Sequence, residues 1–312
     1  MLSMKVLFLF LSLAAISSAT CGRYYPKKNY NRYKRIIGGN EVPVGKWPWQ
    51  VRLVVHSAVL NKTTMEVTLE EGRCGGTVIS DRFILTAAHC IPPQSVIHVY
   101  SGIIHGDREE PHNTEKKVIS RVEKAIPHPN YNESGYTDDI GILILEEPLL
   151  FDNTVFPICL PNKDQSIPDD GQAVVAGFGG SNDREEPDNW DLSESDSRLR
   201  ESAVPIIRAE ICKQRFENTT LDNEMFICAG SLGHGTAEGD SGGPLMMEEK
   251  RGRWFQIGVT AFGAVEEGVL FQDVVPGVYT NVKAYCDWIK KTTDEEAVCE
   301  KTTVNLKDIT IS

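Results

Sequence analysis

Three short motifs, far apart along the chain, constrain this sequence more than any other feature. They are TAAHC at 86–90, DIGIL at 139–143 and GDSGGP at 239–244. Each contains one residue capable of proton transfer or nucleophilic attack, namely His89, Asp139 and Ser241. If these residues act together, the fold has to place three distant segments side by side.

The chemistry of serine explains why such a trio is informative. A serine hydroxyl attacks a carbonyl at neutral pH only when a neighbouring base takes its proton and a buried carboxylate sets the tautomer of that base. The order His, Asp, Ser differs from the order in subtilisins (Asp, His, Ser) and in α/β-hydrolases (Ser, acid, His). Asp138 is an alternative acid, but the apolar run that follows Asp139 directly favours Asp139.

With these motifs the chain resembles the secreted serine endopeptidases of the chymotrypsin–trypsin family. The resemblance implies an all-β fold of two antiparallel six-stranded β-barrels with a C-terminal helix, and a catalytic site at their junction. It also implies that the backbone N–H groups of Gly239 and Ser241 form an oxyanion hole, in which loss of one donor lowers the rate about 100- to 1000-fold. A glycine-rich surface turn would explain GDSGGP alone, but not the other two motifs.

The pattern between the motifs is one of short strands separated by turn residues. Strands are expected at Val51–Val55, Thr77–Leu85, Ile140–Leu145, Ala173–Gly177 and Phe255–Thr260, and long loops at Thr63–Gly72 and Gly179–Arg200. Only Val282–Thr292 has the apolar spacing of a helix.

The first part of the chain has the features of an exported precursor. Lys5 precedes an apolar run over 6–16 and small residues over 17–19, so residues 1–19 are expected to be a signal peptide. The run is shorter than the roughly twenty residues that span a bilayer, and no membrane anchor is expected. We therefore expect a secreted, extracellular protein. The net charge of −12 argues against nucleic acid as a partner.

A basic stretch meets an apolar one at Arg35–Ile36, where Ile-Ile-Gly-Gly begins. In the resembled family, cleavage before such a sequence frees an ammonium that folds inward and pairs with the Asp before the nucleophile, here Asp240. The pair tolerates burial because its charges are opposite. This implies an activation propeptide at 20–35, a peptidase domain at 36–291 and a C-terminal tail at 292–312. The activating protease is trypsin-like or furin-like.

The eight cysteines suit an oxidising compartment. The resemblance implies the bonds Cys74–Cys90 and Cys212–Cys228, and a bond between Cys21 and Cys159 that tethers the propeptide; Cys286 and Cys299 remain as a pair. The family usually has a further disulfide that frames the specificity pocket. Ala237 stands at one of its positions and 263–276 contains no cysteine, so this bridge is absent.

The resemblance also locates a specificity pocket, with Gly235 at its floor, Gly263 and Gly277 in its walls and Glu238 at its mouth. Three glycines imply a deep, uncharged slot for a large apolar or aromatic side chain. The alternative is a preference for Lys or Arg, if Glu266, Glu267 or Asp273 reaches into the slot. Two further departures from the family are Ala261 in place of a serine that supports the catalytic Asp, and Phe262 in place of a tryptophan.

The expected partners are polypeptide substrates, an activating protease and protein inhibitors, and the protein is expected to be a monomer. No cofactor or metal is expected, although scattered acids at 104–115 leave a calcium loop open. Acceptor patterns for N-glycosylation begin at Asn61, Asn132 and Asn218. The other histidines are expected in loops or at the surface: His56, His98, His105, His112, His128 and His234. A non-catalytic homologue that acts as a binding module is the alternative from another class.

Overall fold

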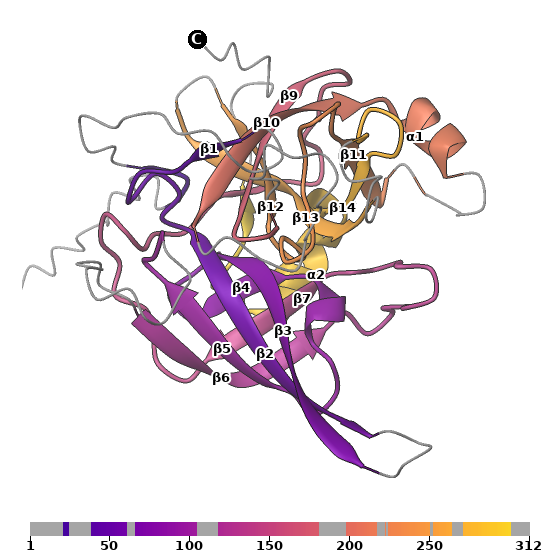
Figure 1. Cartoon of the computed structure of the whole chain (residues 1–312). Helices are drawn as coiled ribbons and strands as arrows, with labels where there is room; N and C mark the ends of the chain where they lie inside the picture. The colour runs from indigo at the N-terminus through magenta and orange to yellow at the C-terminus, as the bar shows by residue number, and fades with distance from the viewer. Residues whose placement is uncertain are drawn as a thin grey trace, which may run out of the picture.

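The computed structural model of the chain describes residues 21–24, 39–60, 66–104, 118–180, 198–216, 222, 224–249, 252–263 and 271–300. The described residues form two barrels of antiparallel strands, one above the other in Figure 1. This confirms the all-β fold with two six-stranded barrels and a C-terminal helix. The signal peptide, most of the propeptide and residues 301–312 lie outside the described residues.

The first barrel is a closed ring in the order β2-β3-β4-β7-β6-β5. Large apolar side chains fill its interior, and Trp49, Leu53, Ile84 and Leu143 have no exposed surface. The strands are β2 (Gln50–Leu60), β3 (Val67–Val78), β4 (Phe83–Thr86), β5 (Val96–Ser101), β6 (Val118–Pro127) and β7 (Gly141–Leu145).

The second barrel runs β9-β10-β11-β14-β13-β12 and closes where β12 pairs with β9. In β10, buried side chains alternate with half-buried ones, as a strand with one face on a core requires. Its strands are β9 (Gln172–Gly177), β10 (Arg200–Ile207), β11 (Phe226–Ala229), β12 (Pro244–Glu248), β13 (Trp254–Phe262) and β14 (Gly277–Asn281). The short strand β1 (Asn40–Glu41) adds to β10, and β8 (Leu160–Pro161) pairs with β15 (Cys299–Glu300).

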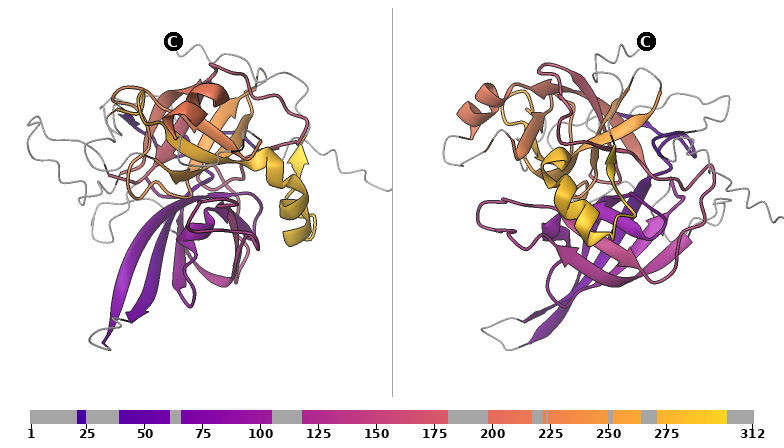
Figure 2. Two further views of the ribbon diagram at one scale, coloured as in Figure 1. Left: turned by 90° about the vertical axis from the view of Figure 1, so that its right-hand side faces the viewer. Right: turned by 180° about the vertical axis from the view of Figure 1, so that it is seen from behind.

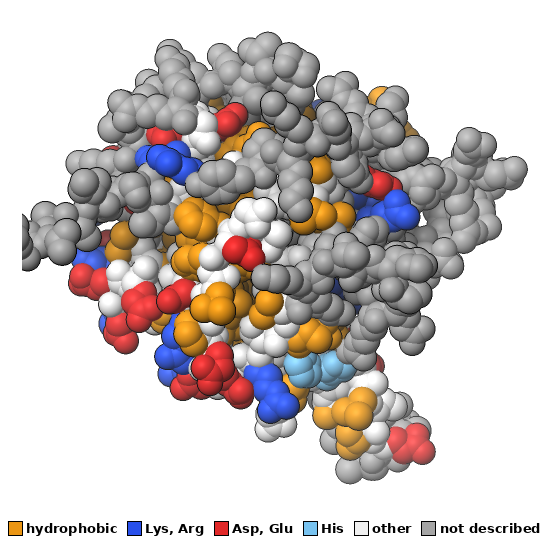
Figure 3. Space-filling view, turned by 90° about the vertical axis from the view of Figure 1, so that its left-hand side faces the viewer, with side chains coloured by type: hydrophobic (Ala, Val, Ile, Leu, Met, Phe, Trp, Pro, Cys, Tyr) orange, Lys and Arg blue, Asp and Glu red, His pale blue; other side chains and the backbone are white. Residues whose placement is uncertain are grey.

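Two expectations about the strands are wrong in detail. Thr77–Leu85 is not one strand, because it contains the end of β3, a turn and then β4. The expected loop Thr63–Gly72 belongs to β3 from Val67 onward, since β3 pairs with β2 residue by residue as far as Leu60. The resulting hairpin projects from the barrel (Figure 2) and exposes both apolar and acidic side chains (Figure 3).

The helices also differ from the expectation. The segment expected as one helix begins as a 3₁₀ helix, η3 (Val282–Tyr285), and continues as the α-helix α2 (Cys286–Thr292). The helix α2 contacts the first barrel, because Trp288 packs on His128. A second short helix, α1 (Ala209–Arg215), was not expected and carries Cys212. The cores of the two barrels are continuous, and the indole N–H of Trp49 donates to the sulfur of Met246 at 3.0 Å.

Candidate active site

The three motifs meet where the barrels join. His89 lies in the 3₁₀ helix η1 (Ala88–Cys90) directly after β4, Asp139 precedes β7, and Ser241 lies in the turn before β12. The turn is held to the first barrel because the N–H of Gly75 donates to the carbonyl of Ser241 at 2.7 Å. The sulfur of Cys90 lies 3.6 Å from the same carbonyl oxygen. Segments from both barrels therefore form one site.

His89 and Asp139 form a hydrogen-bonded pair through both carboxylate oxygens. Oδ2 of Asp139 lies 2.7 Å from Nδ1 of His89, and Oδ1 accepts the backbone N–H of His89 at 2.9 Å. Asp139 is fully buried, and Thr280 of the second barrel donates its hydroxyl to the Asp139 carbonyl at 2.8 Å. This arrangement holds the proton of the imidazole on Nδ1 and leaves Nε2 as the basic nitrogen.

The alternative acid, Asp138, has different neighbours. Its Oδ1 accepts the phenolic hydroxyl of Tyr285 at 3.2 Å and lies 3.5 Å from Nδ1 of His128. It adopts a left-handed backbone conformation, with φ of 53°. The geometry therefore places Asp139, rather than Asp138, against His89.

Two glycines shape the turn that carries Ser241. Gly239 and Gly242 have φ angles of 89° and 78°, which L-residues with side chains rarely adopt. A Cβ on Gly242 would overlap the hydroxyl of Thr86 and lie 2.6 Å from the carbonyl oxygen of Gly75. The turn can therefore pack tightly on the first barrel only with glycine at this position. No hydrogen bond joins the Ser241 hydroxyl to His89 among the described residues.

Asp240 is buried behind the same turn. Its carboxylate accepts the N–H groups of Gly179 at 2.8 Å and Ala237 at 2.9 Å. Burial raises the pKa of this carboxyl to about 6, against the opposing effects of the two N–H groups and of Arg200. A Cβ on Gly177 would overlap the carboxylate, so β9 ends beside it only because this residue is glycine. Arg35 and Ile36 lie outside the described residues.

The residues expected to form a specificity pocket lie close together. A Cβ on Gly263 would be 3.3 Å from the Cα of Gly277, and a Cβ on Gly277 would be 3.0 Å from the hydroxyl of Tyr279. That hydroxyl is in turn 3.3 Å from the Thr236 hydroxyl, next to Gly235. Glu238 is exposed, as is Asp273, whereas Glu266 and Glu267 lie outside the described residues.

One residue of this region was missed by the sequence analysis. Gln272 is 1% exposed, and its Nε2 donates to the carbonyl of Thr236 at 2.7 Å. Its amide lies against Gly235, so the slot is less open at its base than three glycines imply. The backbone of Phe271, the residue before Gln272, forms an isolated antiparallel β-bridge with Leu232. A single glutamine in an irregular segment carries no sequence signal for such a position.

The two other departures from the family pattern both lie at the end of β13. Ala261 is buried and offers no side-chain donor to the carboxylate of Asp139. Phe262 packs its ring on Phe216 and Tyr136, with centroids 5.7 and 5.1 Å apart. A third ring, that of Phe226, lies 6.3 Å away, so the aromatic surface at this position is held by three neighbouring rings.

The eight cysteines form four disulfides and none is free. The bonds are Cys21–Cys159, Cys74–Cys90, Cys212–Cys228 and Cys286–Cys299. Cys74–Cys90 links β3 to η1 beside His89. Two groups of side chains have the spacing of metal ligands, Cys74 with His89 and Cys90, and Cys21 with Cys159 and Glu300. Both groups contain a disulfide, and a disulfide sulfur is not the thiolate that binds a metal.

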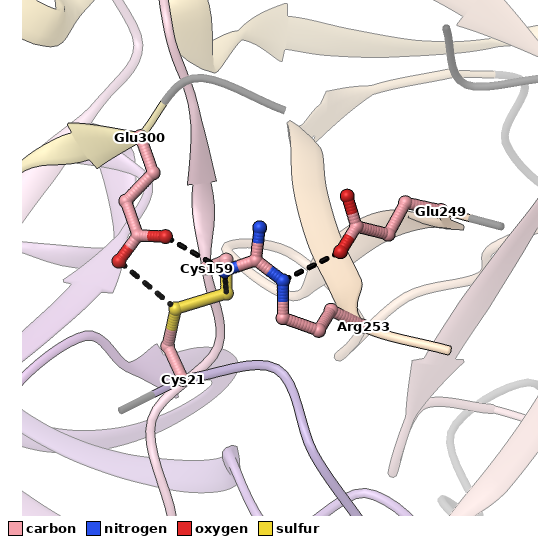
Figure 4. The surroundings of a disulfide bond; sticks show 5 residues. All are labelled: Cys21, Cys159, Glu249, Arg253 and Glu300. Atoms are coloured by element: carbon pink, nitrogen blue, oxygen red, sulfur yellow. Dashed lines mark hydrogen bonds and ion pairs between the residues drawn. A yellow bond between two sulfur atoms is a disulfide. The ribbon is translucent and has the colours of Figure 1, made fainter. Parts of the chain in front are cut away.

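The Cys21–Cys159 bond lies within a chain of charged groups (Figure 4). Glu300 places Oε1 3.4 Å from the sulfur of Cys21 and Oε2 2.8 Å from Nη1 of Arg253. The guanidinium of Arg253 also pairs with Glu249, whose side chain is fully buried. The disulfide therefore attaches the N-terminal segment covalently to the second barrel. The bond lies beside an ion-pair network formed by Glu300, Arg253 and Glu249.

This attachment predicts how the cleaved protein behaves. After cleavage at Arg35–Ile36 the peptide that contains Cys21 remains bound, because the bond to Cys159 crosses the cleavage point. Intact-mass spectrometry should find its mass in the unreduced protein and lose it after reduction. In Cys21→Ser the peptide should be lost without reductant, and loss of the peptide from the unreduced native protein would contradict the prediction.

The structure also bears on the expected positions of the other histidines, the glycosylation acceptors and the calcium loop. His56 and His98 lie in β2 and β5 with their rings in contact, so a loop position is wrong for these two. His128 and His234 are half-buried and lie outside the strands, as expected for loop residues. Asn132 is exposed in a turn, whereas Asn61, Asn218, His105, His112 and 105–115 of the expected calcium loop lie outside the described residues. No helix of the described part is both long and apolar enough to cross a membrane.

Two barrels with a histidine–carboxylate pair and a serine turn at their junction define the class of serine-type peptidases. A family model supports this assignment, since the model described as Trypsin matches residues 36–289. The chain belongs to the trypsin family.

Proposed function

We propose that the chain is a secreted serine endopeptidase that hydrolyses peptide bonds through an acyl-enzyme. The observation that carries the proposal is the His89–Asp139 pair, with Nδ1 and Oδ2 2.7 Å apart, beside the turn of Ser241. Ser241 is the nucleophile, and His89 takes its proton and later gives it to the leaving amine. Asp139 orients the imidazole and stabilises its charged form.

The oxyanion is bound by the backbone N–H groups of Gly239 and Ser241. The left-handed conformation of Gly239 supports this role, because such a turn aims successive N–H groups toward one point. Donors that are held in place before the reaction stabilise the developing charge without reorganisation. No metal or organic cofactor takes part in these steps.

We further propose that the protein is made as a zymogen. Residues 1–19 form the signal peptide, 20–35 the propeptide, 36–291 the peptidase domain and 292–312 the tail. Cleavage at Arg35–Ile36 by a trypsin-like or furin-like protease frees an ammonium that pairs with Asp240. The buried carboxylate with its raised pKa supports this step, because a counter-charge would offset the unfavourable burial. The product is an extracellular, glycosylated monomer that protein inhibitors can block.

For specificity, we propose cleavage after large apolar or aromatic residues, with Gly263 and Gly277 as the walls of the slot. Neither glycine carries a side chain that would narrow the slot, which supports this preference. Cleavage after Lys or Arg is the alternative, and it would require an acidic side chain to reach the slot. Cleavage-site profiling on a mixed peptide library separates the two.

Labelling with a fluorophosphonate tests the mechanism. In the cleaved protein the probe should react with Ser241 alone, and Ser241→Ala should remain unlabelled. Labelling of the uncleaved protein should be far slower, because the oxyanion site is not yet formed. If the cleaved native protein never takes up the probe, the chain is a non-catalytic binding module and the proposal fails.

A further inference from the structure

The outer part of β3 is paired with a neighbouring strand along one edge only. Its residues 67–76 pair with residues 51–60 of β2 in an unbroken register. On the other side, β4 pairs only with Thr77 and Val78. Within the described part of the chain no strand therefore adds to residues 67–76 on this second side, which we call the β3 edge. An unpaired edge offers main-chain N–H and C=O groups with which an extended peptide can pair.

The β3 edge starts beside the nucleophile. The N–H of Gly75 donates to the carbonyl of Ser241 at 2.7 Å, and the carbonyl of Gly75 accepts the hydroxyl of Thr86 at 2.9 Å. Both main-chain groups of Gly75 therefore point away from β2. In an antiparallel strand the main-chain groups of alternate residues point the same way, so those of Glu71 and Leu69 also lie on the β3 edge. One continuous edge thus leads from Ser241 to the outer part of the hairpin.

The β3 edge is open to solvent where it leaves the site. All residues over 67–73 are exposed, on the part of the hairpin that projects from the barrel (Figure 2). Two of them are large and apolar, since Leu69 exposes 82% of its surface and Val67 exposes 64%. A peptide can therefore reach both the main chain and the side chains of this segment, and exposed apolar side chains at a strand edge are typical of a binding surface.

The charged side chains beside the β3 edge are mainly acidic. Among the described residues 66–73, Glu66, Glu70 and Glu71 are exposed carboxylates, and Arg73 is the only cation. Nε of Arg73 lies 3.9 Å from the carboxylate of Glu71, and Nδ1 of His56 lies 4.0 Å from it. Three carboxylates against one guanidinium leave this part of the hairpin negative, so it complements a basic peptide.

We propose that the β3 edge binds the part of the substrate that follows the cleaved bond, as an added antiparallel strand. The inference rests on the proposed function and adds a second recognition surface to it. A substrate that leaves Ser241 along this edge runs opposite to β3, because β3 runs toward Ser241. Main-chain hydrogen bonds to the added strand give affinity, and its alternate side chains give specificity.

The expected register follows from the position of the nucleophile. The cleaved carbonyl lies at Ser241, next to Gly75, and Glu71 comes four residues before Gly75. Paired strands advance by about the same rise per residue, so about the fourth residue after the cleaved bond lies opposite Glu71 and about the sixth opposite Leu69. Residues opposite each other share a face. Lysine or arginine is therefore favoured at the fourth position and a large apolar residue at the sixth.

The test uses the cleaved full-length protein and peptides that are identical up to the cleaved bond. Peptides with six residues after the bond should exceed those with two in kcat/KM about tenfold, because only the longer ones form the added strand. Among the longer peptides, lysine at the fourth position should exceed glutamate about fivefold. This ratio should fall toward one in about 1 M salt, since both charges are exposed.

Three variants locate the effect on the β3 edge. Glu71→Lys should invert the preference at the fourth position, so that glutamate exceeds lysine. Glu147→Lys is the matched control, because Glu147 is exposed beyond the end of β7, and the same change of charge there should keep the native ratio. Leu69→Pro removes an N–H that faces the β3 edge and none that bonds to β2, and proline is tolerated at such a place. It should lower the advantage of the longer peptides about threefold.

Fluorophosphonate labelling of Ser241 identifies the variants in which the site is formed. Equal cleavage of short and long peptides, a native Lys/Glu ratio near one, or the native ratio in labelled Glu71→Lys overturns the role of the β3 edge and leaves the proposed function intact. If Leu69→Pro takes up no label, peptide length and the Glu71 variant decide. Absence of both label and cleavage in the native protein would instead defeat the proposed function.

Discussion

Replacement of Asp139 by asparagine should lower kcat of the cleaved protein about 10⁴-fold. This is the loss known for the same replacement in a catalytic triad of this family. The reason is visible here, because both carboxylate oxygens of Asp139 accept hydrogen bonds from His89, one from the backbone N–H and one from Nδ1. Asparagine has one oxygen, so its NH₂ group must face one of these two donors.

The favourable solution keeps the backbone bond and turns the NH₂ group toward Nδ1. His89 then holds its proton on Nε2, the nitrogen that has to accept the proton of Ser241. The fold should be retained, because the replacement is isosteric and the hydrogen bond from the Thr280 hydroxyl to the main-chain carbonyl of residue 139 does not involve the carboxylate. The measurement is kcat on a peptide substrate, with unfolding by urea as the check on stability.

Asp138→Asn is the matched control. Asp138 contacts Tyr285 and His128, and asparagine tolerates its left-handed φ of 53°. Activity should therefore change only a few-fold, as expected for a group outside the triad. If the two variants lose activity equally, the carboxylate of Asp139 does not have the role assigned to it.

The uncleaved protein should lose stability as the pH rises from about 4 to about 6, because of Asp240. Burial raises the pKa of Asp240 from its ordinary value of 3.8 to about 6 in the folded chain. Between these values the folded chain binds more protons than the unfolded chain, so the free energy of unfolding decreases with rising pH. A shift of roughly two units corresponds to about 3 kcal/mol.

Asp240→Asn isolates this contribution from that of the other carboxyl groups. The free energy of unfolding in urea would be measured for both proteins at pH values from 4 to 7. Relative to the native chain, the variant should gain up to about 3 kcal/mol across this range. In the cleaved native protein the ammonium of Ile36 should abolish the loss of stability. Identical pH dependence of the uncleaved native chain and the variant would contradict the prediction.

Most of the fold could be predicted from the chain itself, for a physical reason. Short apolar segments between turn residues can bury their side chains only as strands, and the three motifs limit how those strands are arranged. The hairpin of β2 and β3 was misjudged because its outer part, from Val67 to Gly72, is acidic and exposed and is held by cross-strand pairing. Such pairing depends on a distant partner, which local composition does not indicate.

The sequence by itself determined the residue types of the site, the order His89, Asp139, Ser241 and the glycines that the turn of Ser241 requires. These depend on local chemistry, since only certain residues transfer protons or adopt the necessary backbone angles. The tertiary structure decided which of Asp138 and Asp139 faces His89, and it placed Gln272 beside Gly235. Both depend on contacts between segments far apart in the chain, because the direction of a side chain and the space available to it are set by packing.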